Sequence, residues 1–191
     1  RALAQVWRPA WQEAAIVADS DVMSLYGSEL NAELSSLTKR AIALEFPAGE
    51  ENKTRATKQR LEDELLASGF GRQTCIVALG GGISLDVAGF VAATYMRGVA
   101  HVNLPTSLLG QVDASIGGKT AVNTPQGKNL IGAFHQPRAV LIDSRYLATL
   151  PLAEWRNGLA EIVKHAVIAD ADLFSWIEAG LAALRAPGGI D

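Results

Sequence analysis

The sequence has few of the residues from which function is most often inferred. Its 191 residues include 1 cysteine and 3 histidines. The single cysteine, Cys75, excludes an internal disulfide framework, and its place in the apolar run 75–79 predicts a buried, inert thiol in a reducing compartment. No apolar run approaches the roughly 18 residues that span a bilayer, and the first residues do not form a secretory signal. These absences predict a cytoplasmic protein without a membrane partner.

A strong excess of charge of one sign is also missing. The 17 Lys and Arg residues against 20 Asp and Glu give a net charge of −3, which argues against a nucleic-acid partner. Hydrophobic residues make up 49% and charged residues 19%, so the chain should fold around a core. Because the sequence begins at Arg1 and ends in the linker-like run 187–191, we expect a fragment of a longer chain.

Strand and helix patterns alternate along the first 150 residues. Apolar runs predict buried strands at 14–18, 41–46, 74–79, 101–104 and 139–142, and helical spacing appears at 22–26, 52–68 and 83–96. This alternation predicts an α/β fold with a Rossmann-like parallel sheet. From 108 to 137 the periodicity weakens, which predicts a site-bearing loop region. Helical spacing then runs from Pro151 to 169 and from 172 to about 184, so we expect residues 1–150 to form one domain and 151–191 to begin an all-helical one.

Three consecutive glycines, Gly80 to Gly82, join a buried strand to a helix. Glycines let the backbone approach a phosphate, and the helix N-terminus offers free N–H groups, so a dinucleotide pyrophosphate is the expected ligand. The pattern is not the usual G-x-G-x-x-G fingerprint, because Leu85 stands where its last glycine would be. Asp86, one turn into the helix, could orient this loop or simply be solvated.

A group of polar residues gathers in the weakly periodic region. It comprises Asp113, Lys119, Asn123, Lys128 and Asn129. Residues 117–120 suggest a P-loop, but that motif requires glycine at position 113, which excludes a nucleoside triphosphatase. Ammonium groups neutralise phosphate or carboxylate, and amides hydrogen-bond to hydroxyls, so these side chains suit a small, anionic, hydroxyl-rich ligand. A solvated hairpin is the alternative.

One predicted helix carries Glu161, Lys164 and His165. Glu161 and His165, four residues apart, share a helix face and could hold a metal. Two ligands do not complete a site, and the spacing alone favours an ordinary polar pair. His101 and His135 have no sequence neighbours that would mark them as catalytic.

In chain order, these motifs resemble the 3-dehydroquinate synthase family. The matching segments are 80–90, 95–98, 105–109, 111–113, 117–123, 127–129, 132–137, 150–151 and 158–164, with a looser match at 47–53. The resemblance implies an enzyme of aromatic amino acid biosynthesis that closes 3-deoxy-D-arabino-heptulosonate 7-phosphate into 3-dehydroquinate and releases phosphate. It also implies catalytic use of NAD, a divalent metal such as zinc or cobalt, and a homodimer.

The same resemblance implies roles for particular residues. The cofactor contacts would be Asp19, Glu50, Lys53, Gly81, Gly82, Asp86, Thr106, Ser107, Lys128 and Thr149. Asp113, Lys119, Asn129 and Lys164 would hold the substrate, and Arg97 would meet its phosphate from a neighbouring subunit. Glu161 would be a metal ligand.

The chain departs from the family pattern at two points. Leu85 stands where members commonly carry glycine, which could alter packing under the pyrophosphate. The two histidines that complete the family's metal site come from a later helical region, and His165 is not where a ligand is expected. We therefore expect this stretch alone to bind metal poorly and not to turn over. Another sugar-phosphate cyclase, a metal-dependent polyol dehydrogenase, and a non-catalytic NAD-binding module remain alternative functions.

Overall fold

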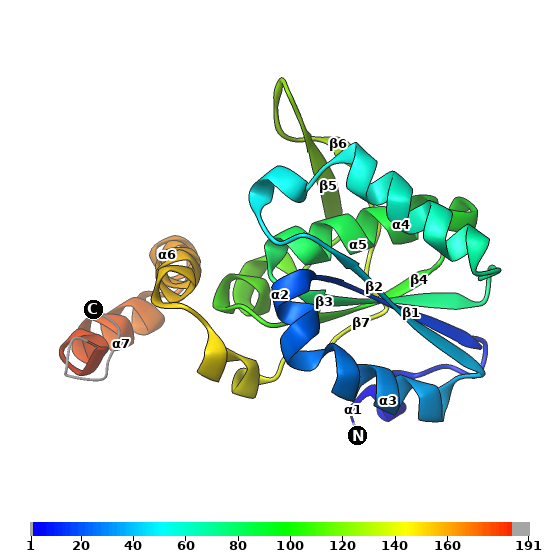
Figure 1. Ribbon diagram of the computed structural model, residues 1–191. Helices are drawn as coiled ribbons and strands as arrows, with labels where there is room; N and C mark the ends of the chain where they lie inside the picture. Colours follow the sequence, from blue (N-terminus) through cyan, green and yellow to red (C-terminus); the bar gives the residue numbers. More distant parts are fainter. Residues whose placement is uncertain (1, 185–191) are drawn as a thin grey trace.

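A parallel five-stranded sheet forms the centre of the protein (Figure 1). The structure, a computed structural model, describes residues 2–184 and the side chains of residues 2–180. The strand order is β2-β1-β3-β4-β7. The strands are β1 (Glu13–Asp19), β2 (Arg40–Phe46), β3 (Thr74–Gly80), β4 (Ala100–Pro105) and β7 (Ala139–Val140). The predicted Rossmann-like α/β fold is confirmed.

Helices cover both faces of this sheet. On one face lie α1 (Ala2–Val6), α2 (Ser20–Val22) with the π-helical turn η1 (Met23–Gly27), and α3 (Ser28–Leu37); on the other lie α4 (Arg55–Ala67) and α5 (Gly82–Thr94). The central strand β3 is buried throughout, and its alternate residues enter two separate cores. Ile76 packs toward α4 and α5, whereas Val77 packs toward α3. Each such buried aliphatic side chain stabilises the fold by about 1.5–3 kcal/mol, which explains the continuous apolar run.

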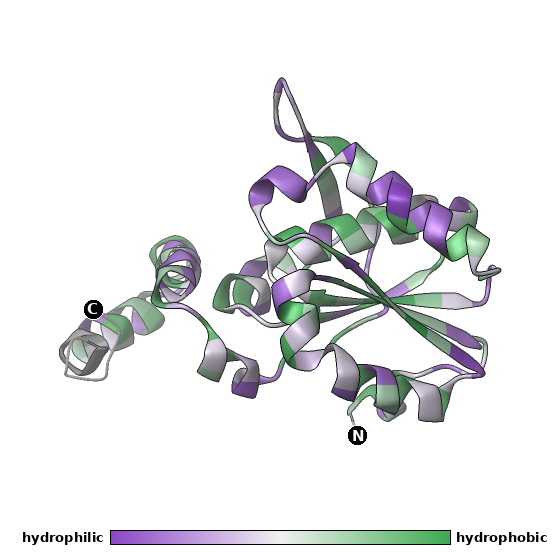
Figure 2. Ribbon diagram, in the orientation of Figure 1, coloured by the Kyte–Doolittle hydropathy of each residue, from purple (hydrophilic) through white to green (hydrophobic). Residues whose placement is uncertain are grey.

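The prediction for Cys75 is confirmed in its burial. Its thiol is fully buried within β3, and this burial raises the pKa of the thiol, so it stays protonated and inert. The hydropathy colouring shows the same division, with hydrophobic central strands and a largely hydrophilic α4 (Figure 2). No helix in the part of the chain that the structure describes is long and apolar enough to cross a membrane.

The strand order places a topological switch beside β1. The chain passes from β1 to β2 on one side and then returns to β3 on the other. Ligands of open α/β sheets bind at the carboxyl ends of the strands at such a point. Asp19 ends β1 and Gly80 ends β3, so the predicted cofactor loop lies at this edge.

The prediction of a loop region over 108–137 is wrong for much of its length. After the π-helical turn η4 (Gly110–Ala114), β5 (Lys119–Thr124) and β6 (Gly127–Phe134) form an antiparallel hairpin that projects beyond the sheet (Figure 1). Gly132 makes the close pairing feasible, because a Cβ atom there would collide with the carbonyl oxygen of Thr120. The hairpin packs on α5 at Gly89, so tertiary contact stabilises strands whose own hydrophobic pattern is weak.

Other boundaries differ by a few residues. The helix expected over 52–68 is preceded by the 3-10 turn η2 (Glu50–Asn52), and the strand expected over 139–142 pairs only at its first two residues. The chain continues through η5 (Ser144–Thr149) into α6 (Leu152–Ala169) and α7 (Ala171–Leu184). Gly158 of α6 lies against Leu108, which brings this helix to the η4 segment. The linker-like run 187–191 lies outside the described residues.

Candidate functional site

The glycine loop has the geometry that anion binding requires. Gly80 has φ +145°, which a side chain disfavours, and Gly81 precedes α5 without a side-chain cap. A Cβ atom on Gly81 would lie 3.2 Å from Ser107 Oγ, and one on Gly82 would lie 3.6 Å from Ala114. The backbone N–H groups at the start of α5 therefore have no side-chain cap, and the loop passes close to Ser107, next to Thr106, which is the arrangement expected of an anion-binding helix N-terminus.

Leu85 is not part of this arrangement. Its side chain is 3% exposed and belongs to the core between α5 and the sheet, where it approaches Gly110. The leucine that replaces the family's usual glycine therefore fills the core behind the loop. Its effect on cofactor binding stays a prediction.

A buried lysine connects three of the predicted residues. Lys53 is 4% exposed, and its ammonium group forms a short ion pair with Asp86 and donates a hydrogen bond of 2.6 Å to Asn129 Oδ1. Burial raises the pKa of Asp86, Lys53 opposes that rise, and the nearby charge of Glu50 adds to it. Lys53 directly follows η2, Asp86 lies on α5 and Asn129 lies in the hairpin, so their meeting depends on the tertiary fold.

Glu50 and Lys128 form a second part of this network. Lys128 Nζ lies 3.3 Å from Glu50 Oε1, and Asn123 Nδ2 donates to the same oxygen over 2.8 Å. Burial alone would raise the pKa of Glu50, but the hydrogen bonds from Asn123 and Lys128 lower it. Glu50 is therefore a carboxylate at neutral pH. The amide of Asn123, expected to contact a ligand, instead bonds within the protein.

Four predicted residues line one cavity of about 700 Å³ between α5, η4 and the hairpin. They are Asp86, Asp113, Lys119 and Asn129. Lys119 is exposed at the start of β5 and Asp86 is half-buried on α5, so an ammonium group and a carboxylate both line the cavity. The cavity combines an ammonium group, an amide and carboxylates, which are the groups expected for an anionic, hydroxyl-rich ligand.

A carboxylate–imidazole cluster lies beside the same cavity. One potential ligand atom from each of Asp113, Glu161 and His165 lies within 4.8 Å of the others. Asp113 Oδ1 is 3.9 Å from His165 Nε2, and Lys164 forms a short ion pair with Glu161 that raises the pKa of the lysine. Carboxylate oxygens and an imidazole nitrogen are a donor set that suits zinc or cobalt. The sequence did not favour His165 as a metal ligand, but its imidazole lies close enough to Asp113 and Glu161 to bind the same ion.

Two further predicted cofactor residues, Asp19 and Thr149, each hydrogen-bond a side chain from a distant part of the chain. Asp19 Oδ1 caps α2 through the Val22 N–H, and its Oδ2 accepts a 2.8 Å hydrogen bond from Ser84 Oγ. Thr149 Oγ1 makes a short hydrogen bond with the Tyr26 hydroxyl. Ser84 and Tyr26 were missed in the sequence, because each lies more than sixty residues from its partner and no local motif signals the pairing.

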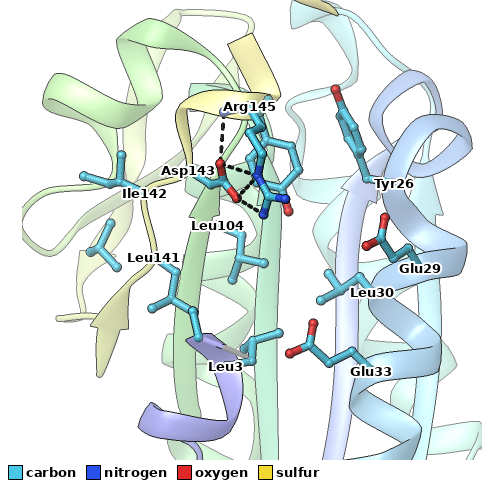
Figure 3. A pocket seen from close by; sticks show the side chains of 13 residues that line it. Leu3, Tyr26, Glu29, Leu30, Glu33, Leu104, Leu141, Ile142, Asp143 and Arg145 are labelled. Atoms are coloured by element: carbon cyan, nitrogen blue, oxygen red, sulfur yellow. Dashed lines mark hydrogen bonds and ion pairs between the residues drawn. The ribbon is translucent and has the colours of Figure 1, made fainter. Parts of the chain in front are cut away.

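Tyr26 also borders a separate cavity of about 540 Å³ on the α3 side of the sheet (Figure 3). Its apolar floor includes Leu30 and Leu104, and Arg145 is held by a bidentate ion pair with Asp143. None of the predicted site residues lines this cavity. The glycine loop and the hairpin therefore form the stronger candidate site.

Arg97 is not brought to that site within this chain. It lies exposed in η3 (Tyr95–Arg97), at the opposite end of α5 from Gly82, with a left-handed φ of +69°. A helix of 13 residues is about 20 Å long, so Arg97 lies far from the glycine loop, and it is not among the residues that line the cavity. Its predicted role in another subunit's site stays open.

Comparisons with known proteins agree with this geometry. A family profile described as "3-dehydroquinate synthase N-terminal" matches residues 43–157. A 3-dehydroquinate synthase of Pelotomaculum thermopropionicum is 49% identical over 176 residues, which are 92% of this chain and 47% of that protein. The chain thus spans about half the length of the curated relatives it matches.

Two solved structures share the fold. A 2-epi-5-epi-valiolone synthase from Streptomyces hygroscopicus subsp. jinggangensis 5008, with NAD+ and Zn2+ bound, has a TM-score of 0.82 and 38% identity, covering 94% of this chain and 51% of that one. A 2-deoxy-scyllo-inosose synthase complexed with carbaglucose-6-phosphate, NAD+ and Co2+ has a TM-score of 0.81 and 34% identity, covering 88% and 47%. Because the family profile matches residues 43–157 and a curated 3-dehydroquinate synthase is 49% identical over 92% of this chain, the chain belongs to the 3-dehydroquinate synthase family.

Proposed function

We propose that this chain is the cofactor-binding part of an enzyme that converts 3-deoxy-D-arabino-heptulosonate 7-phosphate into 3-dehydroquinate and phosphate. One observation carries the proposal. Residues from α5, η4 and the hairpin line a single cavity next to an open helix N-terminus and a carboxylate–imidazole cluster. This arrangement provides an anion site, substrate contacts and a metal-binding set side by side.

The residues fit NAD and a divalent metal. The space beside Gly81 and Gly82, which a Cβ atom would fill, accommodates a pyrophosphate, and Asp113, Glu161 and His165 supply oxygen and nitrogen donors. When bound, NAD supplies a reversible hydride acceptor and the metal a Lewis acid for the hydroxyl that is oxidised. Relatives with this fold are named as holding NAD+ with Co2+ or Zn2+, which supports the same assignment.

The chain's own side chains have distinct tasks in this proposal. The N–H groups at the start of α5 bind the cofactor's pyrophosphate, and Lys53 fixes Asp86 beneath it. Lys119 neutralises the anionic substrate, and the amide NH2 of Asn129 donates to a substrate hydroxyl. Holding these groups before the substrate arrives lowers the entropic cost of reaching the reactive geometry.

The remaining assignments concern the larger assembly. We propose that α6 and α7, following residue 150, begin a helical domain that supplies further metal ligands, and that Arg97 acts in the site of a second copy in a homodimer. Arg97 is exposed and does not line this cavity, which supports the second assignment. The fully buried, protonated Cys75 thiol is compatible with a cytoplasmic location.

Phosphate release by the full-length gene product tests the function. The assay supplies the heptulosonate phosphate, NAD and zinc, and absorbance reports NADH in the same cuvette. We expect phosphate release that depends on NAD and proceeds without NADH accumulation, because the hydride returns to the substrate. Accumulating NADH would indicate a polyol dehydrogenase, and NAD binding without turnover would indicate a non-catalytic module. Turnover of a different sugar phosphate only would indicate another cyclase.

A matched pair of lysine variants tests the site itself. Lys119→Met should lower kcat/KM by about 100-fold, because a charged group that faces the developing negative charge is lost. Lys39→Met is the control, since Lys39 is exposed and hydrogen-bonds Gln12 away from the cavity. Equal activity of the two variants would contradict the assignment of this cavity.

A further inference from the structure

Asn123 occupies a break in the regular pairing of the hairpin. The register between β5 and β6 shifts between Val122 and Thr124, so Asn123 lies at a bulge. Its backbone N–H donates to Lys53 O over 2.8 Å, and Asn123 forms an isolated bridge with Thr54. Bulges beside functional sites commonly redirect a side chain. Here the bulge turns Asn123 toward the segment that carries Glu50 and Lys53.

Both ends of the Asn123 amide are engaged. Its Nδ2 donates to Glu50 Oε1 over 2.8 Å, and its Oδ1 accepts from the Asn129 backbone N–H over 3.0 Å. Asn129 has a φ of +57°, a left-handed conformation that residues with a side chain adopt rarely and that asparagine tolerates better than most. The hydrogen bond from Asn129 to Asn123 therefore helps to hold an unfavourable backbone in place.

This one amide connects two segments that are more than seventy residues apart. On one side, Glu50 also faces Lys128 Nζ at 3.3 Å. On the other, Asn129 Oδ1 accepts from Lys53 Nζ at 2.6 Å, and Lys53 pairs with Asp86. The side chains that depend on this connection are Glu50, Lys53, Asp86, Lys128 and Asn129.

We propose that Asn123 is a positioning residue, which orients the Lys128–Asn129 turn and the Glu50–Lys53 turn as one unit for cofactor and substrate. It does not contact the reacting atoms; it acts through Glu50 and Asn129. The inference rests on the proposed function for its kinetic consequence, whereas its structural part, the ordering of Asn129, stands independently. Replacing the amide should leave the fold intact and misalign the groups that carry the chemistry.

The first test uses Asn123→Ala in the full-length gene product. We expect kcat, at saturating NAD and substrate, to fall by about 100-fold, because saturation cannot restore orientation lost by displacement of about 1 Å. A residue that only stabilises the fold would leave kcat unchanged below the unfolding temperature. Asn31→Ala is the control, since Asn31 is half-buried on α3, far from the hairpin. A wild-type kcat for Asn123→Ala would overturn the proposal.

A polarity exchange provides a second, specific test. Asn123→Asp keeps the acceptor for the Asn129 N–H but places a carboxylate against Glu50. Adding Glu50→Gln supplies an amide donor to the new carboxylate and rebuilds the bond with its direction reversed. We expect the double variant to recover kcat at least about tenfold over Asn123→Asp, a coupling that only interacting residues show. If the loss in the double variant equalled the sum of the losses in Asn123→Asp and Glu50→Gln measured singly, the link between the two residues would be contradicted.

Hydrogen exchange separates this inference from the proposed function. In Asn123→Ala, we expect the amide of Asn129 to exchange at least about tenfold faster, with no change at Asn31. If the wild-type protein released no phosphate from the heptulosonate phosphate, the proposed function would fail, and the exchange rates would still report on the positioning of the turn. Unchanged exchange at Asn129 would refute the positioning role even in an active enzyme.

Discussion

His101 should make the stability of this protein fall steeply below neutral pH. The imidazole is 2% exposed in β4, stacks on His135 with 5.1 Å between ring centroids, and its Nδ1 has no hydrogen-bond partner within the described residues. Burial, followed by the charges of His135 and Arg138, lowers the pKa of His101 from 6.5 to about 4. The folded protein thus keeps this side chain neutral in a range where the unfolded chain protonates it.

The sign and size of the effect follow from this difference. Between pH 6.5 and pH 4 the unfolded state binds about one proton more than the folded state, so the free energy of unfolding decreases as the pH falls. Each pH unit in that window changes the free energy by about 1.4 kcal/mol. Lowering the pH from 7 to 5 should therefore cost about 2 kcal/mol through His101 alone.

His101→Phe isolates this contribution, because phenylalanine keeps an aromatic ring in the core and cannot titrate. Urea unfolding followed by tryptophan fluorescence at pH 7 and pH 5 measures both proteins. The wild type should lose about 2 kcal/mol more than the variant, or roughly 1 M in midpoint for a typical slope. Groups that do not interact with His101 contribute equally to both proteins and cancel in the comparison. Parallel pH dependences would refute the reasoning.

Two further substitutions test the packing of the hairpin and the buried ion pair. Gly89→Ala should destabilise the protein by about 1–3 kcal/mol in thermal denaturation, because its methyl group would collide with Thr120. Gly180→Ala is the control: this glycine has open space around it, so the substitution should stabilise the protein by about 0.5–1 kcal/mol. Similar shifts for both variants would contradict the tight contact at Gly89. Lys53→Met should weaken NAD binding in a fluorescence titration by about 10- to 100-fold, since Asp86 would lose its buried partner cation; unchanged affinity would place the network outside the cofactor site.

Much of the fold follows from local sequence features. The buried runs at 14–18 in β1 and 75–79 in β3 are apolar throughout, as expected of strands covered on both faces, and helical spacing follows each of them. The hairpin was only the alternative interpretation of its region, because its exposed β6 has no regular alternation of apolar and polar residues. What stabilises it is contact with α5 at Gly89, which the hairpin's own sequence does not encode.

For the candidate site, the sequence by itself determined the glycine loop, since a buried strand, three glycines and a helix are consecutive in the chain. It also identified most of the polar residues, because their spacing matches a family. Only the tertiary structure decided which of them meet. Asn123 hydrogen-bonds to Glu50 and Asn129 within the protein. His165 comes within reach of Asp113 because α6 packs against η4 through Gly158. Such pairings depend on contacts between distant segments, which local propensity and spacing cannot specify.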